Sequence, residues 1–192
     1  MPLLRPFSYQ SSVIPVLPLA LMAYLEAPVP LLVGLTKQPR VQGTDRFLIV
    51  NVHTGEVQCT KPLPRLPGES ELVPRLENVL KKLKLTQPPL GGVKRVFTSW
   101  LFGEDSRRLM ESFSSVLQVH FLKFFENFES YCITEVGKTS SVSVFMRDSF
   151  MESVPLESKD FMKDFMGTQI FINYEDTRLR LLDIEKTYTH NK

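Results

Sequence analysis

The feature that most constrains this chain is a long apolar run that proline interrupts. Residues 12–35 read SVIPVLPLALMAYLEAPVPLLVGL, with four prolines and one glutamate. A membrane-spanning helix needs about 20 continuous apolar residues, but Pro28 and Pro30 would break its hydrogen bonds and Glu26 would carry charge into the bilayer. Polar residues separate the run from Arg5, which does not fit a secretory signal. The run therefore predicts several short buried elements of a large core.

The pattern within this run and just after it predicts short elements of both types. Residues 17–25 are typical of a short helix whose inward face carries Leu21, Met22 and Leu25. Residues 31–35 and 46–52 are unbroken apolar stretches of strand length. Strands without alternation indicate a sheet covered on both faces. We expect these two stretches to be neighbouring buried strands of an α/β fold, in a mostly parallel sheet covered by helices.

The second half of the chain changes character, because proline becomes rare and phenylalanine frequent. Helical spacing predicts helices at about 69–85, 109–128, 143–154 and 157–182, with CITEVGKTSS as a loop between two helices. The apolar stripe of residues 109–128 could be core or a partner groove. We expect two domains, an α/β module at 1–92 and an all-helical segment at 93–192 that packs on it.

Composition excludes several classes of function. The 192 residues are 43% apolar with a net charge of only +2, which gives no electrostatic reason to bind nucleic acid. Cys59 and Cys132 lie far apart in sequence and do not have the spacing typical of metal ligands. We expect no metal, no cofactor and no disulfide, in a reducing, cytoplasmic compartment.

No catalytic pattern is present in the sequence. Residues 132–139, CITEVGKT, resemble a phosphate-binding loop, but the first glycine is replaced by Cys132 and a helical stretch precedes it. We expect no nucleotide hydrolysis. His53 is interpreted as a turn residue, His120 as lying on or beside the apolar helix face, and His190 as part of a loose tail. Glu26 either reaches solvent at a helix end or has a functional partner.

Several segments, taken in order, resemble one known family. The opening stretch through LLVGL resembles the start of the central DENN module, with its PFxWQ-like element, IPVLP, short helix, APxP and apolar strand. Further matching segments are FLIVNVHTG, LPRLPGESELVPRLENVLKKL, FLKFFENF, FMRDSFMES and FMGTQIFINYEDTRL. Tyr9 stands where the family commonly has tryptophan, and Asn51 and His53 where it often has aspartate. The ordered succession identifies the chain as similar to the central and downstream DENN modules.

This resemblance implies a guanine-nucleotide exchange factor for Rab-type small GTPases, which performs no covalent catalysis. Such a protein binds the GTPase switch regions and favours the nucleotide-free state. The alternative is a noncatalytic regulatory or scaffolding module that binds a GTPase or another DENN chain in membrane traffic. Either would act in the cytoplasm or peripherally on vesicle or endosomal membranes through its partners, with no transmembrane segment.

The resemblance also implies partner-binding positions in the segments YQ and EAP. These are Tyr9, Gln10, Glu26, Ala27 and Pro28. Family members carry an amino-terminal lobe that is not seen here, so we expect this chain to act as the carboxy-terminal lobe, with weak exchange unless that lobe is supplied.

Overall fold

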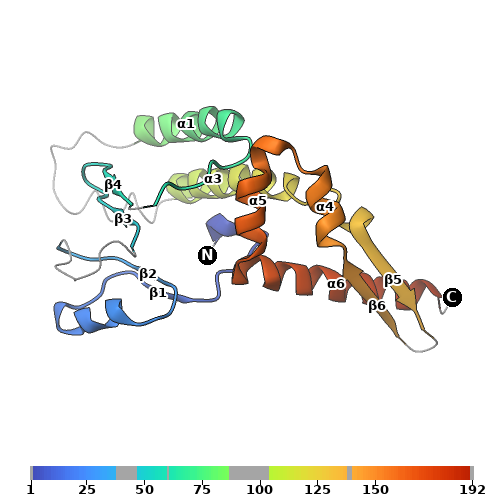
Figure 1. The fold of residues 1–192 in the computed structure, drawn as a ribbon. Coiled ribbons are helices and arrows are strands. Elements are labelled where there is room, and N and C mark those ends of the chain that lie inside the picture. Colours follow the sequence, from blue (N-terminus) through green and yellow to red (C-terminus); the bar gives the residue numbers. More distant parts are fainter. Residues whose placement is uncertain (1, 38–46, 60, 87–103, 138–139, 191–192) are drawn as a thin grey trace. The chain divides into compact units, whose positions relative to one another are not determined.

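The computed structural model describes residues 2–37, 47–59, 61–86, 104–137 and 140–190, and Figure 1 shows their elements. Packing divides the chain into two compact units. The small unit is Gln10–Pro64, and the large unit is Met1–Tyr9 together with Arg65–Lys192. The boundary that the sequence predicted between residues 92 and 93 falls outside the described residues and stays a prediction.

The described part of the small unit contains short strands and one 3-10 helix. Strands β1 and β2 pair in parallel, with Val13 opposite Leu32, and helix η2 forms the crossover between them. Strands β3 and β4 form an antiparallel hairpin. The bounds are β1 Ser12–Ile14, η2 Leu19–Glu26, β2 Leu31–Val33, β3 Ile49–Val50 and β4 Val57–Gln58.

The turn between β3 and β4 is built on Asn51. Its side-chain Oδ1 accepts hydrogen bonds from the backbone N–H groups of His53 (3.0 Å) and Thr54 (3.3 Å). Gly55 completes the turn with φ of 75°, a left-handed conformation that glycine adopts without steric cost. His53 is therefore a turn residue, as the sequence predicted.

The mixed α/β character is confirmed, but a mostly parallel sheet is not. The described strands form three separate two-stranded sheets, of which only β1–β2 is parallel. The stretches expected to be neighbouring buried strands lie in different sheets, and Leu32 and Val50 remain 46% and 53% exposed. Proline explains the short β1–β2 ladder, because Pro15 follows β1, Pro30 precedes β2, and proline lacks the N–H that a ladder requires.

Helix η2 confirms the predicted short helix, but not all of the residues expected on its inward face are buried. Leu25 is buried and Met22 half-buried, whereas Leu21 is exposed and has non-helical dihedral angles (φ −107°, ψ 16°). The spacing of the inward face was derived for an α-helix. A 3-10 helix has three residues per turn, so positions that share a face differ.

The large unit is mainly helical, and its helices α1 and α3 lie side by side (Figure 1). The predicted helix at 69–85 is confirmed as α1, and the apolar stripe of 109–128 is carried by α3 and the short helix η4. The bounds are η1 Pro2–Leu4, α1 Glu69–Thr86, α3 Glu104–Lys123, η4 Phe128–Tyr131, α4 Arg147–Ser153, η5 Leu156–Ser158, α5 Lys159–Met166 and α6 Gln169–His190. Because α6 continues to His190, this residue ends a helix instead of lying in a loose tail.

The prediction of an all-helical second half is wrong. Strands β5 (Cys132–Val136) and β6 (Ser141–Phe145) form an antiparallel hairpin where a helix-to-helix loop and the start of a helix were expected. Strand β6 contacts α6, and its serines and Phe145 are buried while Val142 and Val144 are exposed. In β6 the burial is therefore the reverse of what hydrophobicity predicts, since the valines are exposed and the serines are buried. The small serine side chains face the helix and form hydrogen bonds, as between Ser143 and Thr134 (2.8 Å).

Aromatic rings form most of the core of the large unit. Phe171 and Phe128 are the largest fully buried side chains, and Phe171 is completely inaccessible to solvent. The other buried members are Phe7, Phe125, Phe145, Phe150, Val154, Met162, Met166 and Leu182. The apolar stripe of residues 109–128 thus contributes core at its carboxyl end.

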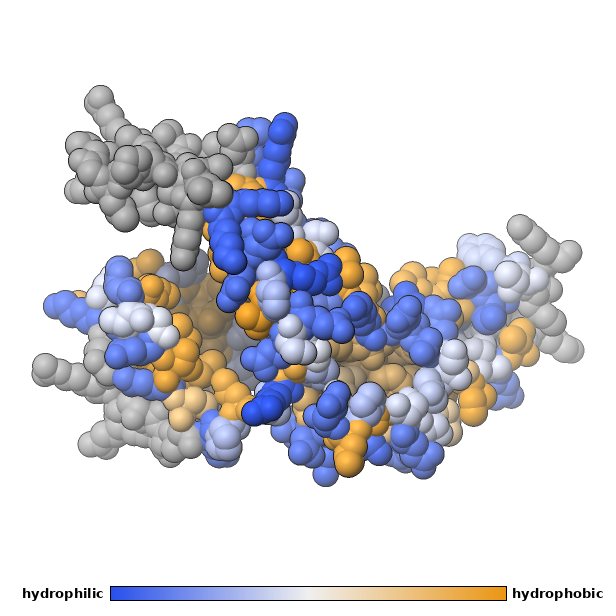
Figure 2. Space-filling view, turned by 90° about the horizontal axis from the view of Figure 1, so that it is seen from above, coloured by the Kyte–Doolittle hydropathy of each residue, from blue (hydrophilic) through white to orange (hydrophobic). Residues whose placement is uncertain are grey.

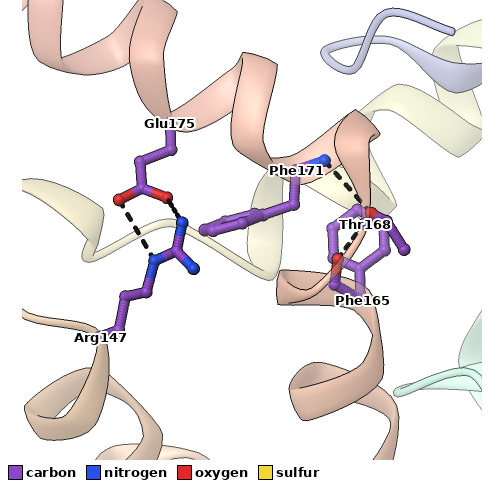
Figure 3. A network of polar contacts seen from close by, with 5 residues as sticks. All are labelled: Arg147, Phe165, Thr168, Phe171 and Glu175. Atoms are coloured by element: carbon purple, nitrogen blue, oxygen red, sulfur yellow. Dashed lines mark hydrogen bonds and ion pairs between the residues drawn. The ribbon is translucent and has the colours of Figure 1, made fainter. Parts of the chain in front are cut away.

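An ion pair lies beside the Phe171 ring of the core (Figure 3). Arg147, at the start of α4, donates from Nε to Oε1 of the buried Glu175 (3.3 Å) and from a terminal nitrogen to Oε2. The same guanidinium lies 5.5 Å from the centre of the Phe171 ring. A carboxylate buried at this depth requires such a partner.

Helices α5 and α6, predicted as one helix at 157–182, are separated at Thr168. Its hydroxyl donates to the carbonyl of Phe165 (2.6 Å) and accepts from the N–H of Phe171 (3.3 Å), as Figure 3 shows. The hydroxyl therefore caps the amino end of α6. Helical spacing continues across this break, which is why the sequence pattern did not reveal it.

His120 is buried where the start of α1 meets α3. Only 4% of the residue is exposed, its ring lies 5.2 Å from that of Phe124, and its Nε2 has no hydrogen-bond partner within the described ranges. Burial lowers the pKa of His120, and the charges of Lys123 and Arg75 lower it further, against the opposing effects of a hydrogen bond with the Pro67 carbonyl and of Glu71.

We expect Phe171→Ala to lower the free energy of unfolding by about 3–5 kcal/mol, because the truncation leaves a cavity in a fully packed core. Urea unfolding followed by circular dichroism measures the change. Leu156→Ala, at a residue that is 85% exposed, is the control and should change stability little. Equal effects of the two variants would contradict the placement of Phe171.

We expect the large unit to lose stability as the pH falls below 6.5, the ordinary pKa of histidine. The folded-state pKa of His120 is lowered, so in this range the unfolded state binds more protons and acid favours unfolding. His120→Phe should flatten this part of the pH profile, whereas His53→Gln, at an exposed histidine, should not. Urea unfolding at a series of pH values tests this, and an unchanged slope in His120→Phe would refute it.

Candidate functional site

The candidate site is the exposed surface around η2 in the small unit. Pro18 enters this helix in an extended conformation (φ −59°, ψ 142°), and Ala27 leaves it in a similar one (φ −58°, ψ 135°). Pro28 and Pro30 then keep the chain extended up to β2, as the sequence predicted. Glu26 is exposed at the end of the helix and has no ion-pair partner in the described part of the chain. Its interpretation as a residue that reaches solvent is confirmed.

The same surface exposes many large apolar side chains. We call this set the apolar surface: Val13, Val16, Leu19, Leu21, Tyr24, Val29 and Leu32, each between 44% and 61% exposed. Among the described residues of the small unit, only Leu17 and Leu25 are buried hydrophobic residues. Figure 2 shows hydrophobic residues among hydrophilic ones on one face of the molecule. Exposed apolar side chains that form a contiguous patch mark an interaction site, and these residues are the candidates for one.

The residues expected to bind a partner are distributed over both units. Glu26, Ala27 and Pro28 lie together at the end of η2, and Gln10 is exposed two residues before β1. Tyr9 is half-buried and belongs to the large unit. Their role in binding stays a prediction. Val13 and Leu32 were not expected at the surface, although the prolines beside each strand indicated how short the strands would be.

Two features describe the chemical character of the described residues. In that part of the chain, no group of three or more histidine, cysteine or acidic side chains is placed to hold a metal ion. Burial raises the pKa of the Cys132 thiol to about 11, so it is protonated at neutral pH and is a poor nucleophile. Lys138 and Thr139 of the CITEVGKT segment lie outside the described residues.

The parallel pair that supports the site depends on Gly34. Its N–H donates to the Ile14 carbonyl (2.9 Å), and its own carbonyl accepts from the Leu17 N–H (2.9 Å). A Cβ atom at Gly34 would lie 2.0 Å from the carbonyl oxygen of Pro15, which is far inside van der Waals contact. Glycine is required here by the close approach of two backbones.

Comparisons with known proteins relate this chain to one family. Residues 1–55 match the model of the DENN (AEX-3) domain, and this region includes β1, η2, β2 and β3. The chain is 27% identical over 190 residues to the human protein DENN domain-containing protein 2B, and 27% identical over 194 residues to the mouse protein of that name. Each alignment covers 93% of this chain but only 15% of the relative. The resemblance read from the sequence is thereby confirmed.

We expect Gly34→Ala to disrupt the β1–β2 pair, at a cost of about 1–3 kcal/mol or more, because the backbones must separate to admit the methyl group. Hydrogen exchange at the Gly34 and Leu17 amides should become faster. Gly55→Asn is the matched control, since its surroundings are open and asparagine tolerates positive φ. Unchanged protection of both amides in Gly34→Ala would contradict this account of the strand pair.

Proposed function

We propose that this chain, which is similar to DENN-domain proteins, promotes guanine-nucleotide exchange on a Rab-type small GTPase, as the carboxy-terminal lobe of the exchange factor. The observation that carries the proposal is the position of the apolar surface, which lies within residues 1–55, the region that matches the DENN family model. Rab exchange is the activity generally associated with this family. The chain spans only 15% of the length of its curated relatives. We therefore propose that it supplies part of the activity of a whole DENN protein.

The proposed mechanism involves no covalent step. Apolar contacts from Val13, Leu32 and Tyr24 would bind the GTPase switch regions, and the exposed carboxylate of Glu26 would orient them. Exchange is accelerated only if these contacts are stronger with the GTPase in its nucleotide-free conformation than in its GDP-bound one. GDP release then follows from differential binding, and abundant GTP replaces it.

The second candidate is a noncatalytic regulatory or scaffolding module in membrane traffic. It would use the same surface to bind a GTPase or another DENN chain without changing nucleotide affinity. The described residues contain no helix that is long and apolar enough to cross a membrane. Either function would bring the chain to a vesicle or endosomal membrane through its partner.

Release of fluorescent GDP from a panel of Rab-type GTPases tests the proposal, with binding measured in parallel on the nucleotide-free GTPases. We expect this chain to accelerate release from at least one of them weakly, and more strongly when an amino-terminal DENN lobe is supplied. Glu26→Lys should reduce release and binding about tenfold or more, because each 1.4 kcal/mol of lost contact changes affinity about tenfold.

The matched control is Glu152→Lys, which makes the same charge reversal at an exposed residue of α4. Chelation of magnesium by EDTA shows that each GTPase can release its nucleotide. Binding that is lost in Glu26→Lys, without any acceleration of release, would favour the noncatalytic module. Both candidate functions would be refuted if, with the second lobe present, the chain neither binds any of the GTPases nor accelerates GDP release from them.

A further inference from the structure

One face of helix α6, in the large unit, exposes apolar side chains. Leu181, Ile184 and Tyr188 are 54%, 54% and 72% exposed, and the exposed Thr177 lies one turn before Leu181. Positions three and four residues apart lie on one side of a helix, so these four residues form one stripe, which we call the α6 stripe. Their spacing alternates as the a and d positions of a coiled coil do.

Other faces of α6 hold the helix in place. Phe171 and Leu182 are buried in the core, and the Thr187 hydroxyl accepts a hydrogen bond from the N–H of Ser141 at the start of β6 (3.1 Å). A short isolated helix is only marginally stable in water, but α6 is already ordered by these contacts. A partner that binds the α6 stripe therefore does not have to order the helix, which lowers the cost of binding.

Exposed charges of opposite sign flank the α6 stripe on its two sides. With Leu181 as an a position, Arg180 is the g residue just before it. Ile184 is then a d position, and Glu185 is the e residue just after it. Arg180 and Glu185 are both exposed. In a parallel pair of helices, each g residue faces the e residue of the next heptad on the other helix, so two copies of α6 bring Arg180 opposite Glu185 twice.

We propose that the α6 stripe is a self-association surface, at which a second copy of this chain packs its own α6 in parallel about a twofold axis. The apolar side chains of the two stripes interleave, and the two Arg180–Glu185 pairs fix the parallel orientation, since an antiparallel pair would bring like charges together. The same surface is used on both copies, as twofold symmetry requires. It covers about three helical turns, so we expect a weak, concentration-dependent dimer.

This surface belongs to the large unit and does not depend on the proposed GTPase function. Sedimentation equilibrium of the full chain over a range of concentrations tests it. We expect Ile184→Lys to weaken dimer formation about tenfold or more, because it replaces a central apolar contact by two like charges. Leu32→Lys in the small unit and Val144→Lys in β6 are the controls, at residues that are 46% and 56% exposed, and should leave the dimer unchanged. Circular dichroism verifies that the variants are folded.

Exchange of the flanking charges tests the pairing. Arg180→Glu and Glu185→Arg should each weaken the dimer several-fold at low salt, because each creates two like-charged pairs. An equal mixture of the two variants should associate again, since each copy then supplies the charge that the other lacks. Leu181→Cys, in a chain whose exposed Cys59 is replaced by serine, should form an intermolecular disulfide, because equivalent a positions adjoin in a parallel pair.

Three results would overturn the proposal. The first is a chain that stays monomeric at every concentration. The second is a dimer that Leu32→Lys or Val144→Lys dissociates while Ile184→Lys does not. The third is a dimer in which the mixed charge variants do not associate again or in which Leu181→Cys forms no disulfide.

Discussion

Burial of the Phe171 ring organises the large unit. This ring, on the first turn of α6, packs against Phe125 from the segment after α3, Phe145 from β6 and Phe165 from α5. Elements from distant parts of the sequence thus meet at one side chain that excludes solvent completely. The Arg147–Glu175 pair lies beside the same ring. A charged pair at the edge of an aromatic core adds specificity of arrangement, since each partner would be costly to bury without the other.

The sequence predicted the parts of this structure that depend on local pattern. Helices α1 and α3 were predicted because their apolar residues recur at helical spacing, and the break at Pro28 and Pro30 was predicted because proline constrains its own backbone and that of its neighbour. The hairpin β5–β6 was not predicted. Its buried positions include Ser141, which forms hydrogen bonds with Thr187 of α6, and Ser143, which forms one with Thr134 of β5. Such polar pairing has no signature in hydrophobic spacing.

At the candidate surface, residues that the sequence predicted to be buried are exposed. Residues 31–35 are apolar enough to suggest burial on both faces, yet Leu32 remains exposed, because local composition does not specify which other strands are present to cover a face. The order of segments indicated the similarity to DENN-domain proteins that the comparisons also find, since that order reports on the chain as a whole. It could not reveal which apolar side chains of η2 are exposed, because exposure depends on three-dimensional packing.

The small unit buries few of its own apolar side chains, so its stability is sensitive to what binds it. A ligand that binds only the folded form adds stability that grows with the logarithm of its concentration. The large unit has a core of its own and does not share this dependence to the same degree. Binding and folding should therefore be more closely coupled in residues 10–64 than elsewhere in the chain.

The position of Phe7 bears on how the chain can fold during synthesis. Its ring packs against Phe121, Phe125, Phe165 and Tyr174, so the nearest of these partners in sequence follows it by 114 residues (121 − 7). A ribosome adding about 5–20 residues per second exposes Phe7 for several seconds before that partner exists. The small unit is encoded entirely within this interval and can form its local contacts first. The amino-terminal segment must then be captured by a core whose residues are made later, which favours folding of the large unit after the small unit.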